Sequence, residues 1–156
     1  MLQYLYGHDD AVAQFVAQLI PHNHGRDFGR VKTIGVLDED GLLIAGIVYG
    51  NWQPEAGVIE IAAASISPRW LTRRTIELMY GYAFDQCGCQ LVVQRTPADN
   101  ERLLRQLAVG GYRFVLVPRL LGRDRDCVIC TLTEEAYRAS KFIRRKAPVE
   151  QMEIAA

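Results

Sequence analysis

Apolar residues near the start of the chain recur at helical spacing, which predicts a first helix. The residues on its apolar face are Val12, Phe15, Val16, Leu19 and Ile20. Asp9 or Asp10 can cap this helix, and Pro21 helps to end it. The polar, glycine-containing segment 22–30 is expected to be a loop.

Three apolar-rich runs follow, and they predict three strands. They cover residues 31–37, 42–49 and 58–66. A loop ending in Gly41 joins the first two strands as a hairpin, and residues 51–57 are expected to turn into the third. This pattern places Glu60 inside an otherwise apolar strand.

A turn over residues 67–74 leads to a long helix over 75–87, which Gly88 is placed to end in a left-handed cap. Its predicted core face is made of Ile76, Met79, Tyr80, Ala83, Phe84 and Cys87.

The pattern then predicts a strand over 90–96, a helix over 100–109 and strands over 112–117 and 127–132. Residues 118–126 are expected to form a charged loop. A last helix starts at 133–135, with acidic residues where the helix dipole favours them, and its periodicity is lost after Ile143. The resulting order, α-β-β-β-α-β-α-β-β-α, predicts a mixed α/β layer structure with an antiparallel first half.

Length and composition fit this picture. A chain of 156 residues suits one domain spanning 1–156, with 144–156 expected to be a loose tail. No apolar run approaches the ~20 residues that span a bilayer, and the N-terminus lacks the pattern of a secretory signal. A soluble, cytoplasmic protein without a membrane partner is therefore expected.

The 18 basic residues balance the 18 acidic ones, so the net charge predicts no nucleic-acid partner. Fifteen of the basic residues are arginines, all but Lys32, Lys141 and Lys146. Arginine binds phosphate and carboxylate in a bidentate manner, although a GC-rich genome would produce the same bias.

The four cysteines are Cys87, Cys89, Cys127 and Cys130. Their Cys-x-Cys and Cys-x-x-Cys spacing admits a zinc site. The second pair falls in a predicted strand, however, where its odd separation directs the two side chains to opposite faces. Buried free thiols are favoured over zinc or disulfides, and no metal is expected.

The segment NERLLRQLAVGGYRF resembles a motif of the GNAT superfamily of acyl-CoA-dependent N-acetyltransferases. Asn100 takes the motif's Asn position, Leu103 its apolar position and Leu107 its Tyr position, and Gly111-Tyr112 matches its Gly-Phe pair. The hairpin IGVLDEDGLLIAGIVYG is similar to the family's second and third strands. The segment PRWLTRR is also similar to GNAT-like proteins of phages and prophages.

The resemblance implies a single GNAT-like domain of mixed α/β (α+β) class. Its central, mostly antiparallel sheet would carry helices on both faces and a V-shaped splay between strands 58–66 and 90–96, counted after a short N-terminal strand. Acetyl-CoA would lie in this splay, and no metal is implied. Homodimers are common in the family, so a homodimer is a possible assembly.

The resemblance also implies a set of cofactor-binding residues. The pantetheine arm would pair with the backbone at the end of the first splayed strand, and the pyrophosphate would bind where the long helix begins. Asn100 and Leu103 would complete the set. The residues of the strand end and of the helix start are Ala64, Ser65, Ile66, Leu71, Thr72, Arg73, Arg74, Thr75 and Ile76.

The helix start departs from the family pattern, because Arg74 and Ile76 replace the two glycines that allow close approach of the backbone. Arg69, Arg73 and Arg74 gather near a helix N-terminus, where each cation is disfavoured by about 0.3–1 kcal/mol. A bound anion would reverse that cost, and the alternative is that the arginines simply face solvent. Ser67-Pro68 is itself a good helix start, so the helix can also begin earlier.

Leu107 is a second departure, because the family's Tyr at this position often protonates the leaving thiolate and Leu cannot. A thiolate leaves tolerably without help, since the pKa of a thiol is about 8.5. Tyr49 and Tyr112 are candidate replacements, although core packing explains both.

Glu60 is the candidate general base, because an amine must lose its proton before it attacks a thioester. Burial in the strand would raise the pKa of this carboxyl, and the protein-acetylating branch of the family carries a catalytic Glu on this strand. Glu60 can instead face solvent or pair with an arginine. His22 and His24 in the loop after the first helix compete for the role, although loop histidines are often just exposed.

Arg119 and Arg123, in the loop 118–126, would border the acceptor site by resemblance. They can recognise a charged acceptor or protein partner, or they can belong to a solvated turn of mixed charge.

These observations predict an N-acetyltransferase that transfers an acetyl group from acetyl-CoA directly to an amine, a small molecule or a protein, in a ternary complex. The alternative is a weak or inactive GNAT-like fold that binds CoA or a protein partner. A different α/β domain that mimics the β-α-β unit is a third possibility.

Overall fold

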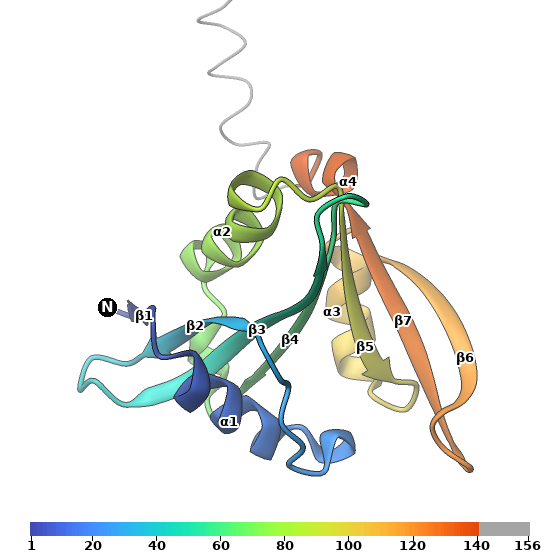
Figure 1. Cartoon of the computed structure of the whole chain (residues 1–156), viewed down its shortest axis with the longest axis horizontal. Helices are drawn as coiled ribbons and strands as arrows, with labels where there is room; N and C mark the ends of the chain where they lie inside the picture. Colours follow the sequence, from blue (N-terminus) through green and yellow to red (C-terminus); the bar gives the residue numbers. More distant parts are fainter. Residues whose placement is uncertain (141–156) are drawn as a thin grey trace, which may run out of the picture. The chain divides into compact units, whose positions relative to one another are not determined.

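The computed structural model describes residues 1–140. The expected tail 144–156 and the expected continuation of the last helix to Ile143 lie outside the described residues. The helices and strands are β1 Gln3–Leu5, α1 Asp9–Leu19, β2 Lys32–Leu37, β3 Leu43–Gln53, β4 Val58–Ser65, α2 Arg73–Gly81, β5 Leu91–Pro97, α3 Glu101–Val109, β6 Arg113–Gly122, β7 Arg125–Thr133 and α4 Glu134–Arg138 (Figure 1).

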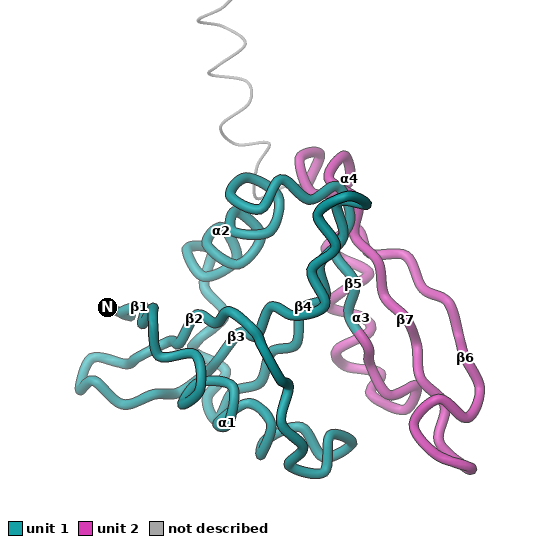
Figure 2. Tube along the Cα trace, in the orientation of Figure 1, with its two compact units in different colours: residues 1–94 teal, residues 95–156 magenta. Residues whose placement is uncertain are grey.

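The seven strands are hydrogen-bonded in the order β1-β2-β3-β4-β5-β7-β6. Strands β1 to β4 pair antiparallel in sequence, β4 and β5 pair parallel, and β6 and β7 form an antiparallel pair. The predicted mixed α/β class with a mostly antiparallel sheet is therefore confirmed. The chain divides into two compact units at Gln94, inside β5 (Figure 2), and each unit is described by itself below.

In the first unit, α1 and α2 cover opposite faces of the sheet (Figure 1). Gly46 of β3 lets α1 approach closely, because an added Cβ would lie 2.6 Å from Val16 Cγ2. Adjacent strand residues point to opposite faces, and Tyr49, three residues on, donates its hydroxyl to the Met79 carbonyl of α2 at 2.7 Å. Helices on both faces were predicted, and the first unit has them.

The start of α1 differs from the predicted cap. His8 occupies the N-cap position and makes no side-chain cap hydrogen bond. The Asp9 carboxylate instead accepts hydrogen bonds from the Thr33 amide and hydroxyl, at 2.9 and 2.8 Å. Asp9 therefore ties the helix to β2 rather than capping its own first turn.

The long second helix begins and ends differently from its prediction. Ser67 caps a separate 3-10 turn, Pro68–Trp70, and α2 then begins at Arg73 with Thr72 as its cap. The predicted C-terminal part winds into a π-helical turn, Tyr82–Gln86, which one additional residue per turn produces. Gly88 follows with φ +68°, the left-handed conformation expected there.

Two predicted loops are shorter than expected, because strands extend into them. Strand β3 continues to Gln53, so that the turn before β4 covers only residues 54–57. In the second unit, β6 runs through Pro118 to Gly122 and β7 starts at Arg125, which leaves a two-residue turn in place of the loop 118–126. Alternation alone missed these extensions because each is interrupted by a register shift, between Gly50 and Gln53 in β3 and between Val117 and Gly122 in β6.

The second unit has its own buried residues. Leu107 of α3, Tyr137 of α4 and the β7 residues Cys127, Cys130 and Leu132 are all buried. Thr133 caps α4 by accepting the Ala136 amide at 3.0 Å.

Cys89 is also buried, and Cys87 is half-buried. Among the described residues no helix is both long and apolar enough to cross a membrane, and no group of three or more potential metal ligands is found within 1–140.

Candidate active site

Strands β4 and β5 pair over only a short stretch, at the start of both strands. The parallel register joins Val58 to Leu91, Ile59 to Val92 and Glu60 to Val93. Strand β4 continues to Ser65 and stays paired with β3 along this length, up to Ala45↔Ser65. Within residues 1–140, the far half of β4 therefore pairs with β3 on one side, while its pairing with β5 on the other side ends at Glu60, which is the opening that the predicted splay requires.

The backbone of this far half alternates in direction. The Ile66 amide donates to the Ile44 carbonyl at 2.9 Å, so in an antiparallel ladder the amides of Ala64 and Ala62 also point toward β3. Those of Ala63 and Ser65 point the opposite way, in line with Gly57, whose carbonyl accepts the Leu91 amide of β5 at 3.1 Å. A ligand lying beside this edge could thus pair with Ala63 and Ser65.

This alternation refines the predicted pantetheine residues. Ser65 presents its backbone to the open edge, whereas Ala64 and Ile66 use theirs within the sheet. Ala63 was missed by the sequence reasoning. The signal that could have found it is the period of two counted from the β3–β4 hairpin.

The start of α2 is built on threonines. The Thr72 hydroxyl accepts the Thr75 amide at 3.1 Å, and the Thr72 carbonyl accepts the Ile76 amide at 3.0 Å. Thr75 is fully buried, and its hydroxyl donates to the Trp70 carbonyl at 2.7 Å. Leu71, which precedes this turn, is exposed. The turn that lacks glycines is thus closed by side-chain hydrogen bonds.

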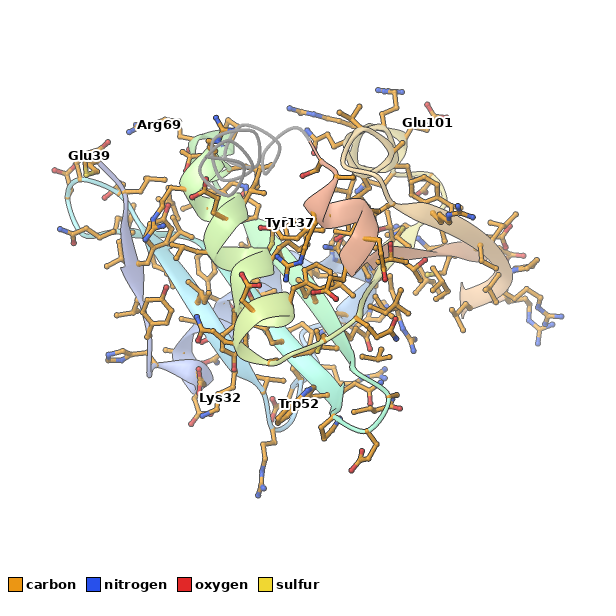
Figure 3. All side chains as sticks on the ribbon, turned by 90° about the horizontal axis from the view of Figure 1, so that it is seen from above. Lys32, Glu39, Trp52, Arg69, Glu101 and Tyr137 are labelled. Carbon is orange, nitrogen blue, oxygen red and sulfur yellow. The ribbon has the colours of Figure 1, made fainter. Side chains whose placement is uncertain are left out.

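The three arginines predicted to gather here have acidic partners. Arg69 Nη2 donates to both carboxylate oxygens of Glu39, at 2.7 and 2.9 Å (Figure 3). Glu77 lies 3.7 Å from Arg73 Nε and 3.8 Å from Arg74 Nη1. Arg69 is therefore directed to the β2–β3 hairpin, while Arg73 and Arg74 remain at the helix start.

The Glu39 carboxylate is held in its ionised form. A hydrogen bond with its own backbone, followed by the Arg69 guanidinium, lowers the pKa of Glu39. Because both side chains of this pair are largely exposed, its contribution to stability is small.

Glu60 lies half-buried on β4, opposite Gly50 of β3 and Val93 of β5. It shares the α1 face of the sheet with Ala62 and Ala64, which pack against the cluster of Ala13, Val16 and Val48. The Val31 side chain lies beside Gly50, because an added Cβ there would be 3.3 Å from Val31 Cγ1. Glu60 thus belongs to the last residue pair before β4 and β5 stop pairing.

The loop after α1 carries the two histidines. His22 belongs to a short 3-10 turn, Pro21–Asn23, and is half-buried. His24 follows in a left-handed conformation with φ +54° and is exposed. Phe28 and Val31 at the end of this loop pack on the same cluster as Ala62 and Ala64, so the loop reaches the sheet face that Glu60 occupies.

The motif residues of the second unit have structural roles. Asn100 caps α3, because its side-chain oxygen accepts the Leu103 amide at 3.3 Å. Leu103 is half-buried, and Leu107 is 8% exposed. The residue at the family's Tyr position is thus a core residue here.

The two arginines of the predicted acceptor loop lie on the β6–β7 hairpin. Arg119 belongs to β6, has φ +66°, and donates its amide to Asp126 Oδ1 at 3.0 Å. Arg123 stands in the two-residue turn and is exposed.

Tyr49 and Tyr112 fit their core interpretation. Tyr112 is 6% exposed, and the hydroxyl of the buried Tyr49 is engaged by Met79. Burial raises the pKa of Tyr49 well above its ordinary value, so its proton stays in that hydrogen bond.

Comparison with known proteins connects this geometry to one fold. No family model matches the sequence, and no curated protein matches it either. Solved structures do match. Mutant forms of the spermidine/spermine N-acetyltransferase SpeG from Vibrio cholerae superpose with a TM-score of 0.73 and 12% identity, over 88% of this chain and 97% of theirs.

Two further solved structures extend this likeness. The ribosomal-protein-S5-alanine acetyltransferase from Vibrio fischeri gives a TM-score of 0.65 at 10% identity, over 87% of this chain and 94% of its own. A dodecameric spermidine N-acetyltransferase from V. cholerae gives 0.68 at 13% identity, over 88% and 96%. At such identities the likeness establishes the GNAT fold.

Proposed function

We propose that the protein is an acetyl-CoA-dependent N-acetyltransferase that transfers the acetyl group directly to an amine in a ternary complex. The observation that carries this proposal is the end of β4–β5 pairing at Glu60↔Val93. It leaves the outward backbone of Ala63 and Ser65 next in sequence to the turn that starts α2. The GNAT fold supports the assignment, since the solved structures of this fold described above are acetyltransferases.

In this proposal the backbone of Ala63 and Ser65 pairs with the amides of the pantetheine arm. Residues 71–76 hold the pyrophosphate, with Arg73 and Arg74 supplying positive charge at the helix N-terminus. Asn100 and Leu103 remain predicted contacts. The protein supplies no metal in this scheme.

Glu60 is the general base of the proposed reaction. It accepts a proton from the substrate ammonium, directly or through water, and the neutral amine attacks the thioester carbonyl. A C–N bond forms, the attacking nitrogen gives up its second proton to solvent, and the C–S bond breaks. CoA leaves as the thiolate, because Leu107 has no proton to donate. His22 and His24 are proposed to line the amine site from the α1 side, and Arg119 and Arg123 to contact the acceptor.

The acceptor is proposed to be an amine because the similar structures are named for amine acceptors, polyamines and a protein alanine. A homo-oligomer is proposed on the same basis, since one of them is dodecameric. Location in the cytoplasm and the likeness of residues 68–74 to phage-encoded proteins remain sequence-based hypotheses.

Binding of acetyl-CoA is the first test. Mass spectrometry of the purified protein is expected to detect CoA carried through purification, and calorimetric titration to give a measurable dissociation constant. If millimolar acetyl-CoA gives no heat of binding and no competition, the enzyme assignment is contradicted.

Acetyl transfer by Glu60→Gln is the second test, after an acceptor has been found by screening amines. Loss of a general base is expected to slow transfer about 100-fold or more, with little change in affinity for acetyl-CoA. Glu55→Gln is the matched control, because Glu55 is exposed in the β3–β4 turn and its loss leaves the rate unchanged. An unchanged rate in Glu60→Gln would remove Glu60 as the base.

A binding module of the same fold is the second candidate function. It is favoured by the acidic partners of Arg69, Arg73 and Arg74, which reduce the positive charge offered to a pyrophosphate. Acetyl-CoA binding without turnover of any amine would support this alternative.

A further inference from the structure

We propose that Tyr4 and Thr75 are positioning residues for the cofactor turn 71–76, where they replace the glycines as the groups that set its shape. This inference rests on the proposed function. It concerns residues of the first unit only, and one of them, Tyr4, lies about seventy positions away in the sequence.

The Thr75 hydroxyl stands at the centre of a hydrogen-bond network. It donates to the Trp70 carbonyl at 2.7 Å, because a carbonyl can only accept. Tyr4 Oη lies 2.8 Å away and Thr72 Oγ1 3.0 Å away. With its single proton committed to Trp70, Thr75 Oγ1 accepts from both hydroxyls, so its one donor and both lone pairs are used.

Thr72 is bound to the same network from both sides. Its hydroxyl donates to Thr75 Oγ1 and accepts the Thr75 amide at 3.1 Å, and its own amide donates to the Trp70 carbonyl at 3.0 Å. Arg73 and Arg74 lie between two threonines that are held in this way. The buried hydroxyl therefore decides where the first turn of α2 presents its amides and its two arginines.

Tyr4 anchors this network to the sheet. Tyr4 and Trp70 both pack against the buried cluster of Val36, Ile44 and Ala45. Ile44 and Ala45 also hold the end of β4, because the Ile44 carbonyl accepts the Ile66 amide and Ala45 pairs with Ser65. One cluster thus supports both the pantetheine edge and the pyrophosphate turn.

Strand β1 holds Tyr4 in place for this contact. It has only three residues, Gln3–Leu5, at the edge of the sheet. Its pairing with β2 places Tyr4 opposite Val36, and the long tyrosine side chain then reaches the turn. The hydroxyl, rather than the strand pairing, is what the proposal requires.

The test compares two ligands that differ in the phosphates. Acetyl-CoA carries the pyrophosphate, and S-acetylpantetheine lacks it. Tyr4→Phe, which removes one hydrogen bond, is expected to weaken acetyl-CoA binding about five-fold. Thr75→Val, which removes all contacts of the hydroxyl, is expected to weaken it about 10- to 100-fold. Binding of S-acetylpantetheine stays unchanged in both, measured by calorimetry or competition.

Two further variants serve as controls. Thr75→Ser keeps the hydroxyl and is expected to bind acetyl-CoA nearly as the wild type does. Tyr6→Phe removes a hydroxyl from an exposed tyrosine next to β1 and leaves both affinities unchanged. Circular dichroism and thermal unfolding confirm that each variant is folded.

A ligand-independent measurement completes the test. Amide hydrogen exchange of residues 72–76 is expected to accelerate in Thr75→Val and Tyr4→Phe and not in Tyr6→Phe, because the hydroxyl network holds this turn closed.

The outcomes separate this inference from the proposed function. If the wild type binds no acetyl-CoA, the proposed function fails and the positioning role fails with it. If the wild type binds and both ligands weaken equally, or neither weakens, the positioning role alone is overturned.

Discussion

Leu107 illustrates how a single residue can serve packing at the expense of chemistry. It occupies the position of the family's proton-donating Tyr, yet it is buried in α3. A hydroxyl there would need a hydrogen-bond partner in an apolar setting. In the proposed reaction the CoA thiolate therefore leaves without being protonated by the residue at position 107.

Tyr82 should make stability depend on pH in the alkaline range. Burial, followed by a hydrogen bond with Cys87, raises the pKa of Tyr82 to about 12 from an ordinary 10.0. Because the folded value lies above the unfolded one, this stabilisation is full below about pH 10 and is lost as the pH rises toward 12. Denaturant unfolding at intervals from pH 9 to 12 measures it.

Tyr82→Phe removes the titrating group, so the free energy of unfolding should fall less steeply with pH than in the wild type. Tyr6→Phe, at an exposed site, should leave the slope of the free energy of unfolding against pH as it is in the wild type. Identical slopes in Tyr82→Phe and the wild type would contradict the assignment.

At the scale of elements, the contact between α1 and β3 depends on glycine rather than on apolar surface alone. The Cβ of an alanine at Gly46 would lie 2.6 Å from Val16 Cγ2 and 2.8 Å from Val12 Cγ1. Both valines are fully buried. To make room, helix α1 would have to move away from the sheet, or Val12 and Val16 would have to adopt other rotamers.

Gly46→Ala should therefore destabilise the protein by about 1–3 kcal/mol, measured by chemical denaturation. Gly81→Ala is the control, because Gly81 is helical and an added Cβ would have only ordinary contacts. Helix propensity predicts a gain of up to about 1 kcal/mol there. Equal stabilities of Gly46→Ala and the wild type would show that α1 is not in tight contact.

The far half of β4 should show alternating hydrogen exchange. Without ligand, the amides of Ala62 and Ala64, which point to β3, should exchange slowly, and those of Ala63 and Ser65 should exchange fast. Acetyl-CoA should protect Ala63 and Ser65 and leave the other two unchanged. Protection of Ala64 instead would place the cofactor on different backbone groups.

The whole molecule is electrically balanced, with 18 basic and 18 acidic residues and an isoelectric point near 6.8. It also exposes several large apolar side chains on β6, among them Val115 and Leu116. Charge repulsion between copies is weakest where the net charge vanishes. Exposed apolar side chains on an edge strand then favour association.

Solubility should therefore pass through a minimum near pH 6.8 and recover about two pH units to either side. Turbidity at fixed concentration across a pH series measures this. Val115→Lys should raise solubility at the minimum, whereas a surface change of the same charge away from β6, Gln14→Lys, should raise it less. Equal gains in solubility from Val115→Lys and Gln14→Lys would show that β6 contributes no more to association than other parts of the surface.

Much of the fold could be predicted from the sequence, because periodicity is a local property. The helix face with Val12 and Val16, the hairpin through Gly41 and the motif opened by Asn100 each indicated an element that the structure has. The elements that were mistaken are those whose limits depend on distant partners. Strand β6 extends to Gly122 because, after a register shift, Gly122 pairs with Arg125 of β7.

In the candidate site, too, local sequence pattern predicted some features, and contacts between distant residues set the others. The placement of Glu60 on β4 was readable from the spacing of apolar and polar positions. Residues 71–76 came from the family resemblance, and the spacing placed the start of α2 two residues too late. Ala63 was not readable from the spacing, because the direction of a backbone amide depends on which neighbour the strand pairs with. Nor was the Arg69–Glu39 pair, which joins residues 30 positions apart.

The sequence by itself determined most of the helices and strands, the order in which they follow, and the chemical groups available for the proposed acetyl transfer. Each of these depends on side-chain pattern over a few consecutive residues. Only the tertiary structure decided that β4 and β5 stop pairing at Glu60, and that a tyrosine from β1 meets the buried Thr75 hydroxyl. Such contacts join distant parts of the chain, and local pattern carries no information about which of them form.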